Sequence, residues 1–392
     1  MNSLDNTLAV NTDGGQVRDR MRLSRIMLKG FRSISNQKYE KLPLGDVTVL
    51  LGANGAGKSN IVLFFKMLNH MMTGALGDFV GKYGADQLLF YGLKRTDSLS
   101  FTLCFLSQTE DVEDLYSVEL SHRRSDSLFV KNERIRHFRQ GYTQPQDYFL
   151  TNQEDRGEIF LPKDTRPTSK VISALLSGIR AYQFHDTSDA SHIRNRAYIG
   201  NSRFLYSDGG NLAAFLKMLH DTDEFRPYYD RIVRHIQTVM PQFRDFVLET
   251  VRENYLYLNW RDTSGSDYLF GPDQLSDGSL RFMALTSLLL QPPQIMPKVI
   301  VIDEPELGLH PAAVAELAGM VHSASQYAQI LLATQSTRLV DEFSPEQIVI
   351  IERERGEEGA KIRQLDVDEL RDWLREYSLS ELWEKNVIGA QP

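Results

Sequence analysis

The sequence predicts an α/β protein with a mainly parallel core sheet, an antiparallel β-subdomain and an inserted helical lobe. A β-branched run at residues 47–51 leads through a glycine-rich loop into a helical pattern. Further hydrophobic runs alternate with helical segments near the other end of the chain, at residues 298–305, 329–336 and 347–354. Strands that alternate with helices favour a parallel sheet that is covered on both faces.

Between these two ends the sequence pattern changes twice. Short strand-like runs separated by polar breaks fill residues 99–135 and predict an antiparallel sheet. Residues 136–168 are polar and predict a long loop or extension. From about residue 170 to residue 246 the apolar spacing is helical, which predicts the inserted lobe. No heptad run is long enough for a coiled coil.

Composition excludes several classes of protein. The chain has 392 residues, 42% of them apolar, and a formal net charge of −8, so a strongly basic coat for nucleic acid is excluded. Its single cysteine, Cys104, rules out a disulfide framework and a cysteine zinc site within one chain. No segment approaches the roughly 18 apolar residues of a spanning helix, and the N-terminus lacks the apolar core of a signal peptide. We therefore expect a cytoplasmic protein without a membrane partner.

The glycine-rich loop GANGAGKS, residues 52–59, fits the phosphate-binding pattern G-x-x-x-x-G-K-S/T without deviation. It lies between a predicted strand and a predicted helix, which is the context that this pattern needs. Lys58 would reach the β- and γ-phosphates, and Ser59 would hold Mg²⁺. We assign ATP binding to the whole loop and the residue after it: Gly52, Ala53, Asn54, Gly55, Ala56, Gly57, Lys58, Ser59 and Asn60.

Two acidic residues end the hydrophobic run VIVIDEP. Asp303 and Glu304 would lie at the carboxyl end of a buried strand, where parallel sheets bind their ligands. Two carboxylates there are unfavourable unless a cation meets them. Asp303 is therefore predicted to hold Mg²⁺, and Glu304 to act as the base or orienting group for an attacking water molecule. The alternative is an acidic strand end that faces solvent.

The most discriminating stretch is QLSDGSLRFMAL, residues 274–285, which precedes the acidic strand by about one helix. LSDGSLR resembles the LSGGQ-type signature of ABC-class ATPases, and more closely the LSxGxxR form of the SMC/RecF/OLD branch. The resemblance implies that Ser276 and Gly278 contact the γ-phosphate held by a second subunit, in a head-to-tail dimer with two buried ATP molecules. The alternative is a helix capped by Ser276 with no role across an interface.

Weaker parts of the same resemblance concern Arg32 and Gln87. LKGFRSI, residues 28–34, resembles the first strand of SMC and RecF heads, which implies that Arg32 lies near the nucleotide. EPELGLHP, residues 304–311, resembles the D-loop region of OLD and RecF-like ATPases. Gln87 is either the Q-loop residue that senses Mg²⁺ and water or a surface glutamine.

The sequence departs from the resemblance at Gln335. Many of these heads carry histidine at this switch position, whereas this chain has ATQS. An amide can hydrogen-bond the γ-phosphate or the attacking water, but it cannot carry a proton charge. We therefore assign Gln335 to the catalytic group with Glu304 and Lys58, and expect slow hydrolysis.

From Leu23 onward the chain resembles compact bacterial AAA or ABC-class ATPases of the RecF/SMC/OLD type without a coiled coil, of the kind found in anti-phage defence systems. The implied fold is one ABC-type P-loop ATPase head at residues 21–392, preceded by a flexible tail at residues 1–20. Its expected parts are an N-terminal core with the phosphate loop, a β-subdomain with an extension, a helical lobe with the signature motif, and a C-terminal core with the acidic strand and switch: residues 21–98, 99–168, 169–290 and 291–392.

The function that this resemblance implies is Mg²⁺-dependent ATP binding and slow hydrolysis. ATP would close a homodimer that controls DNA or a protein effector, such as a nuclease or toxin encoded nearby. Two alternatives remain: a RecF-like DNA-repair ATPase, and an ATP-binding scaffold that restrains a toxic partner with little hydrolysis.

A basic stretch bears on the DNA alternative. It either binds a phosphate backbone or forms a solvated face, and comprises Arg123, Arg124, Lys131, Arg134, Arg136 and Arg139, with Arg194 and Arg196 further along. The histidines near residue 185 lack a metal-ligand spacing, so packing, hydrogen bonding or coupling near the nucleotide is expected for them.

Overall fold

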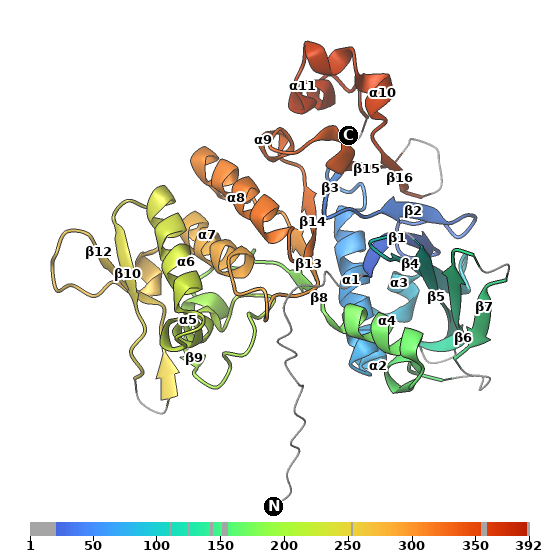
Figure 1. Cartoon of the computed structure of the whole chain (residues 1–392), viewed down its shortest axis with the longest axis horizontal. Helices are drawn as coiled ribbons and strands as arrows, with labels where there is room; N and C mark the ends of the chain where they lie inside the picture. Colours follow the sequence, from blue (N-terminus) through green and yellow to red (C-terminus); the bar gives the residue numbers. More distant parts are fainter. Residues whose placement is uncertain are drawn as a thin grey trace, which may run out of the picture.

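The computed structural model describes residues 21–109, 111–123, 126–141, 144–150, 156–251, 254–353 and 359–389. The predicted tail at residues 1–20 lies outside the described residues. Two six-stranded sheets form the body of the molecule, with a helical lobe on one side (Figure 1).

The parallel sheet has the strand order β16-β15-β3-β14-β13-β8, and only β16 runs antiparallel to its neighbour. The strands are β3 (Val47–Leu51), β8 (Ile179–Tyr182), β13 (Val299–Asp303), β14 (Gln329–Thr334), β15 (Ile348–Glu352) and β16 (Lys361–Gln364). All residues of β3 and of β13 are buried. This confirms the predicted mainly parallel core, in which strands from both ends of the chain lie next to one another.

The second sheet is antiparallel, in the order β2-β1-β4-β5-β6-β7. Its strands are β1 (Arg22–Lys29), β2 (Glu40–Pro43), β4 (Ser98–Leu106), β5 (Val112–Arg123), β6 (Ser127–Arg139) and β7 (Gln146–Phe149). The sheets divide the chain differently from the predicted ranges. β1 and β2, expected in the N-terminal core, extend the antiparallel sheet, and β7 lies in the predicted extension. β8, expected in the helical lobe, belongs to the parallel sheet.

Helices cover both faces of the parallel sheet and build the lobe beside it (Figure 1). They are α1 (Lys58–Met72), α2 (Leu76–Tyr83), α3 (Ala85–Leu88), α4 (Pro167–Ser177), α5 (Leu212–Asp221), α6 (Arg226–Val239), α7 (Asp277–Leu289), α8 (Pro311–Ala324), α9 (Thr337–Val340), α10 (Val367–Leu370) and α11 (Leu379–Glu384). The lobe also contains the short strands β9 (Ala197–Tyr198), β10 (Phe243–Val247), β11 (Tyr255–Leu256) and β12 (Asn259–Asp262). None of the described helices combines the length and apolarity that a membrane crossing requires.

Successive residues of the parallel strands belong to two different hydrophobic cores. Val49 and Ile300 pack on the side of α5 to α8, whereas Leu50 and Val301 pack on the side of α1 and the antiparallel sheet. Because side chains alternate along a strand, a strand buried on both faces must be apolar at every position. This explains the uninterrupted hydrophobic runs in the sequence.

Glu133 joins the antiparallel sheet to the segment that follows it. Its carboxylate is fully buried and accepts hydrogen bonds from the Tyr116 hydroxyl at 2.8 Å and from the backbone N–H groups of Phe160 and Leu161 at 2.7 and 2.9 Å. Arg156 adds an ion pair at 3.4 Å. Three donors and a guanidinium thus compensate a charge that would otherwise be unfavourable in the core.

We expect Glu133→Gln to lower the free energy of unfolding by about 1–3 kcal/mol, because the new amide N–H₂ would face donors instead of accepting from them. Denaturant unfolding measures this change. The matched control is Glu113→Gln, which removes a half-exposed ion pair with Arg25 and should change stability by less than about 1 kcal/mol. Equal effects of the two substitutions would contradict the structural role of Glu133.

Candidate active site

The phosphate loop leaves β3 and enters α1, as the sequence predicts. Its bend is enforced by close contacts at two glycines. A Cβ atom on Gly52 would lie 2.4 Å from the Ile351 carbonyl oxygen, and one on Gly57 would lie 2.7 Å from the Ser33 Oγ atom. Gly57 also has a φ of 121°, which disfavours other residues. The loop therefore packs tightly between β15 and the segment that follows β1.

Lys58 begins α1 and is buried within the loop. Its Nζ atom donates to the Gly52 and Ala53 carbonyl oxygens at 2.6 and 3.0 Å. Burial lowers the pKa of Lys58, and the nearby carboxylates of Glu304 and Asp303 partly offset this shift. The first N–H groups of α1 lack intrahelical partners, as at any helix start. The Lys58 ammonium and these backbone donors therefore lie together at the start of α1. That combination suits the phosphate groups of a nucleotide.

Two further predicted residues lie at the side of the loop. Asn60 Nδ2 donates to Ser33 Oγ at 2.8 Å, so the start of α1 is bound to the segment after β1. Arg32, next in the chain to Ser33, has a φ of 52°, and its guanidinium lies 5.9 Å from the centroid of the Tyr83 ring. Its Nε atom is buried without a hydrogen-bond partner among the described residues. Arg32 thus adjoins the loop through its backbone, and its role in nucleotide binding stays a prediction.

Asp303 ends β13 with its carboxylate buried. The Oδ2 atom accepts a hydrogen bond from Gln183 Nε2 at 2.7 Å, and the Oδ1 atom is buried with no partner in the described part of the chain. The backbone oxygen of Asp303 lies 3.0 Å from His185 Nε2. A carboxylate oxygen that is buried and unpaired is an incomplete arrangement that a cation would complete.

The glutamine that reaches this aspartate is Gln183, not Gln87. Gln87 is exposed on the short helix α3, and no described contact joins it to Ser59 or Asp303. Gln183 follows β8 directly, and β8 pairs in parallel with β13, so the carboxyl ends of the two strands meet. Gln183 is not predicted from the sequence, because β8 lies in a stretch whose apolar spacing is mostly helical. The run IRAY that precedes it is strand-like but too short to reveal its pairing with β13.

Glu304 and Gln335 lie together, as the sequence predicts. Gln335 Nε2 donates to Glu304 Oε1 at 3.3 Å, and the Glu304 backbone N–H donates to the Ala333 carbonyl at 2.8 Å. Glu304 has a φ of 45°, a strained conformation for a residue with a Cβ atom and one that often marks functional sites. These contacts fix the Glu304 carboxylate beside the end of β14.

A third carboxylate, that of Glu306, lies at the site and is not among the predicted residues. It accepts a hydrogen bond from Thr334 Oγ1 at 2.5 Å, and its other oxygen is buried without a partner among the described residues. Burial raises the pKa of Glu306, and the neighbouring Glu304 raises it further. The side chain lies within the predicted D-loop stretch, where the acid two residues after Glu304 was the available signal.

The start of α7 carries the two predicted signature residues. Ser276 is exposed and caps the helix by accepting a hydrogen bond from the Ser279 N–H at 3.1 Å. A Cβ atom on Gly278 would lie 2.2 Å from the Gly308 carbonyl oxygen, so glycine permits α7 to touch the loop after Glu304. Ser276 thus caps α7, and whether it also contacts a second subunit stays a prediction.

Two arginines connect the start of α7 to the segment at residues 183–187 through hydrogen bonds. Arg281 donates to the Phe184 and His185 carbonyl oxygens at 2.9 and 2.8 Å. Arg194 is buried and donates to Asp277 Oδ1 at 2.8 Å and to the Thr187 carbonyl at 2.6 Å. Arg194 was predicted as part of a basic stretch, but its guanidinium is enclosed and unavailable to an external phosphate.

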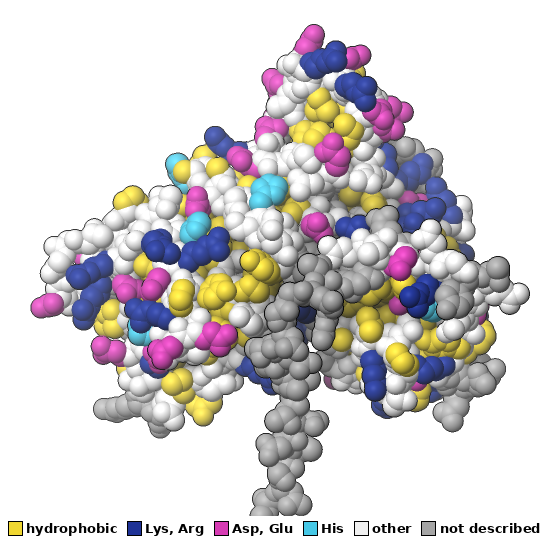
Figure 2. Space-filling model, in the orientation of Figure 1, with side chains coloured by type: hydrophobic (Ala, Val, Ile, Leu, Met, Phe, Trp, Pro, Cys, Tyr) yellow, Lys and Arg dark blue, Asp and Glu magenta, His cyan; other side chains and the backbone are white. Residues whose placement is uncertain are grey.

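The other basic residues lie mostly beside acids or aromatic rings. Lys131 pairs with Glu119 at 2.8 Å, and Arg134 and Arg136 pair with Asp147 at 2.7 and 3.0 Å. Arg123 lies over Phe129 and Arg196 over Tyr255, whereas Arg124 is outside the described residues. Figure 2 shows cationic and anionic side chains interspersed over the visible face. These contacts favour the solvated-face interpretation.

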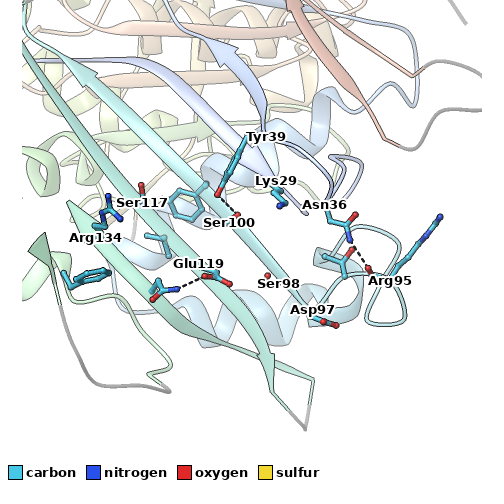
Figure 3. Close-up of a pocket in the computed structure, with 15 residues that line it drawn as sticks. Lys29, Asn36, Tyr39, Arg95, Asp97, Ser98, Ser100, Ser117, Glu119 and Arg134 are labelled. Carbon is cyan, nitrogen blue, oxygen red and sulfur yellow. Dashed lines mark hydrogen bonds between the residues drawn. The ribbon is translucent and has the colours of Figure 1, made fainter. Parts of the chain in front are cut away.

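The antiparallel sheet carries a separate pocket on its outer side, with a volume of about 670 Å³ (Figure 3). Its lining includes Lys29, Tyr39, Ser100, Glu119 and Arg134, and the Tyr39 hydroxyl lies 2.9 Å from Ser100 Oγ. None of the phosphate-loop, acidic-strand or signature residues lines it. The candidate site is thus distinct from this cavity.

The residues at the candidate site suit a nucleoside triphosphate with Mg²⁺. The glycine-lined bend leaves no room for a Cβ atom where it packs, the helix start supplies donors, and Asp303 presents one unpaired buried oxygen. A hydroxyl, a carboxylate and phosphate oxygens are the ligands that Mg²⁺ prefers.

Comparisons with known proteins agree with this geometry. A family model described as "AAA domain, putative AbiEii toxin, Type IV TA system" matches residues 47–341. A crystal structure of an Smc head bound to the C-terminal winged-helix domain of ScpA superposes with a TM-score of 0.51 and 15% identity, over 89% of this chain and 99% of that one. An Smc head with an extended coiled coil, bound to the C-terminal domain of ScpA from Pyrococcus furiosus, gives 0.53 and 14%, over 91% and 99%. No protein of curated function matches significantly.

At these identities the two structures show the fold alone. They confirm the predicted head architecture, in which a mainly parallel sheet, an antiparallel sheet and a helical lobe occur together.

Gly278→Ala tests whether this glycine is needed within one protomer. Because the added methyl group would meet the Gly308 carbonyl oxygen at 2.2 Å, we expect a loss of about 1–3 kcal/mol in the free energy of unfolding. The control is Gly319→Ala in the middle of α8, where nothing lies within 4 Å and a gain of about 0.5–1 kcal/mol is expected. Urea unfolding without nucleotide measures both. Unchanged stability of Gly278→Ala would mean that the contact is not tight.

Proposed function

Since this chain belongs to that AAA-domain family, we propose that it binds ATP with Mg²⁺, hydrolyses it slowly, and uses ATP to close a head-to-tail dimer. One observation carries the proposal. Leu51 lies opposite Thr334 and Asp303 opposite Ala333, so β3, β14 and β13 end at the same edge of the sheet. The phosphate loop, the metal aspartate and the Glu304–Gln335 pair therefore meet there.

Each residue has a role that follows from its chemistry. Lys58 balances negative charge on the β- and γ-phosphates by exchanging its two carbonyl acceptors for phosphate oxygens. Ser59 and Asp303 hold the metal, which when bound neutralises charge that develops on the phosphates. Glu304 accepts a proton from the attacking water or orients it.

Slow turnover is supported by the group beside Glu304. The Gln335 amide donates a hydrogen bond to the Glu304 carboxylate and so orients it. A neutral amide adds no positive charge as the γ-phosphate departs. ATP then acts mainly as a clamp that holds two heads together until hydrolysis releases them.

The exposed start of α7 supports the dimer. Ser276 and Asp277 are exposed, so the N-terminus of α7 is open to a phosphate presented by a second copy. The family description names a putative toxin of a toxin–antitoxin system, and control of a protein effector by the dimer is part of the proposal. A role in anti-phage defence extends this proposal.

The DNA-repair alternative has less support. Arg194 is buried, and Lys131, Arg134 and Arg136 are engaged by acids. Binding of a DNA backbone would need these pairs to open, and its affinity would fall steeply with salt. A titration of gapped duplex DNA at two salt concentrations distinguishes the two functions.

Glu304→Gln should trap an ATP-bound dimer, because the substitution removes the base and leaves the nucleotide-binding residues in place. Light scattering should show twice the monomer mass with ATP and Mg²⁺ and a monomer without them. Lys58→Ala should lose nucleotide binding and stay monomeric in both conditions. Glu384→Gln, an exposed charge change on α11, serves as the control and should behave as the wild type. An unchanged mass of Glu304→Gln on ATP addition would refute the clamp.

Ser276→Arg tests the contact between subunits. In a head-to-tail dimer this variant should bind ATP as a monomer but not hydrolyse it, whereas Ser264→Arg at an exposed turn should remain active. Mixing Ser276→Arg with Lys58→Ala should restore part of the ATPase activity, because each hybrid dimer contains one site with an intact phosphate loop and an intact signature. Normal turnover of Ser276→Arg alone, or no recovery on mixing, would contradict the head-to-tail arrangement.

A further inference from the structure

Lys66 lies two turns after Lys58 on α1 and takes no part in the roles assigned above. Its Nζ atom donates to Gln183 Oε1, and the other end of the same amide donates to Asp303 Oδ2 at 2.7 Å. Asn69, on the next turn of α1, donates to the Ile179 carbonyl at 3.0 Å. α1 is thus hydrogen-bonded to the start of β8 through Asn69 and to the residue after its end through Lys66. Lys66 makes the contact nearer the candidate site.

From this geometry we propose that Lys66 is a positioning residue that fixes the orientation of the Gln183 amide, and through it the carboxylate of Asp303. An ammonium group has three donors and no acceptor, so Gln183 must present its oxygen to Lys66. The amide N–H₂ is then left for the Asp303 carboxylate. A flipped amide would place N–H₂ against the ammonium and oxygen against oxygen, and both contacts would be repulsive.

The consequence lies at Asp303. Because Gln183 holds Oδ2, Oδ1 is the oxygen of this carboxylate that has no partner in the described part of the chain. His185 holds the backbone oxygen of the same residue. Gln183 thus restricts the carboxylate, and His185 the backbone of Asp303, before a metal binds. Residues that orient a metal ligand typically change metal affinity by about 10- to 100-fold when removed.

The test measures the Mg²⁺ dependence of nucleotide binding, without turnover. A fluorescent ATP analogue, mant-ATP, is titrated with Mg²⁺ in the wild type and in Lys66→Met, which keeps the aliphatic stem of the side chain. We expect the Mg²⁺ concentration for half-maximal binding to rise about tenfold or more, whereas binding of mant-ATP in EDTA, through the phosphate loop, stays unchanged. Lys66→Arg should restore most of the wild-type behaviour, because it keeps a donor group toward Gln183.

Two further variants separate positioning from general packing. Gln183→Met should give the same shift as Lys66→Met, and the double variant should be no worse than either, because the two residues act as one unit. Lys217→Met, which removes a partly buried helical lysine paired with Asp221, should leave the Mg²⁺ dependence unchanged. Thermal unfolding without nucleotide identifies any variant that has lost the fold. The Mg²⁺ dependence of the variants that remain folded then tests the role of Lys66.

The inference rests on the proposed function, but the two fail differently. If the wild type does not bind mant-ATP, or if Lys58→Ala binds it equally well, the proposed function is wrong. If the wild type binds mant-ATP and Lys58→Ala does not, but Lys66→Met has the Mg²⁺ dependence of the wild type, only the proposed role of Lys66 is wrong. A lower Mg²⁺ requirement in Lys66→Met would show that the ammonium competes with the metal, and additive effects in the double variant would show independent roles. Either result overturns the proposal.

Discussion

The burial of one carboxylate determines how the candidate site is arranged. Asp303 ends a strand whose residues are all buried, so its charge must be met by groups from other elements. Those groups come from two separate parts of the chain, Gln183 after β8 and Lys58 at the start of α1, and His185 contacts the backbone oxygen of the same aspartate. The parallel sheet brings their strands to one edge, and the buried charge explains why polar side chains gather at this edge within an otherwise apolar core.

The sequence was sufficient for the parts of the site that are local. The phosphate loop is contiguous and lies between a strand and a helix, and the acidic pair ends a hydrophobic run, so both could be predicted with the parallel fold. Gln183 could not be predicted, because its contact with Asp303 depends on which strand pairs with β13. A four-residue strand inside a mostly helical stretch gives little periodicity, and strand order is a property of the whole chain. Lys66 was missed for the same reason, whereas Glu306 follows Glu304 by two residues and had a local signal.

The basic residues illustrate a second limit of sequence patterns. A cluster of arginines and lysines along a strand has the composition of a nucleic-acid surface, yet cross-strand neighbours decide what the charges meet. Glu119 and Asp147 lie on the strands next to β6 and pair with three of its cations. Arg194 lies in a short turn, and its guanidinium satisfies buried carbonyl groups near α7. Pairing of this kind depends on register, which a linear charge count does not contain.

The position of β3 between β14 and β15 also sets an order of events during synthesis. The antiparallel sheet contains β1, β2 and β4 to β7, so all its strands are available as soon as β7 has left the ribosome. β3 has by then been made, but its two neighbours are encoded near the other end of the chain. The bend of the phosphate loop, which Ile351 helps to enforce, can form only when β15 has emerged. A nascent or truncated chain therefore carries the phosphate-loop sequence without the strand that encloses its bend, and the candidate site is complete only when translation is nearly finished.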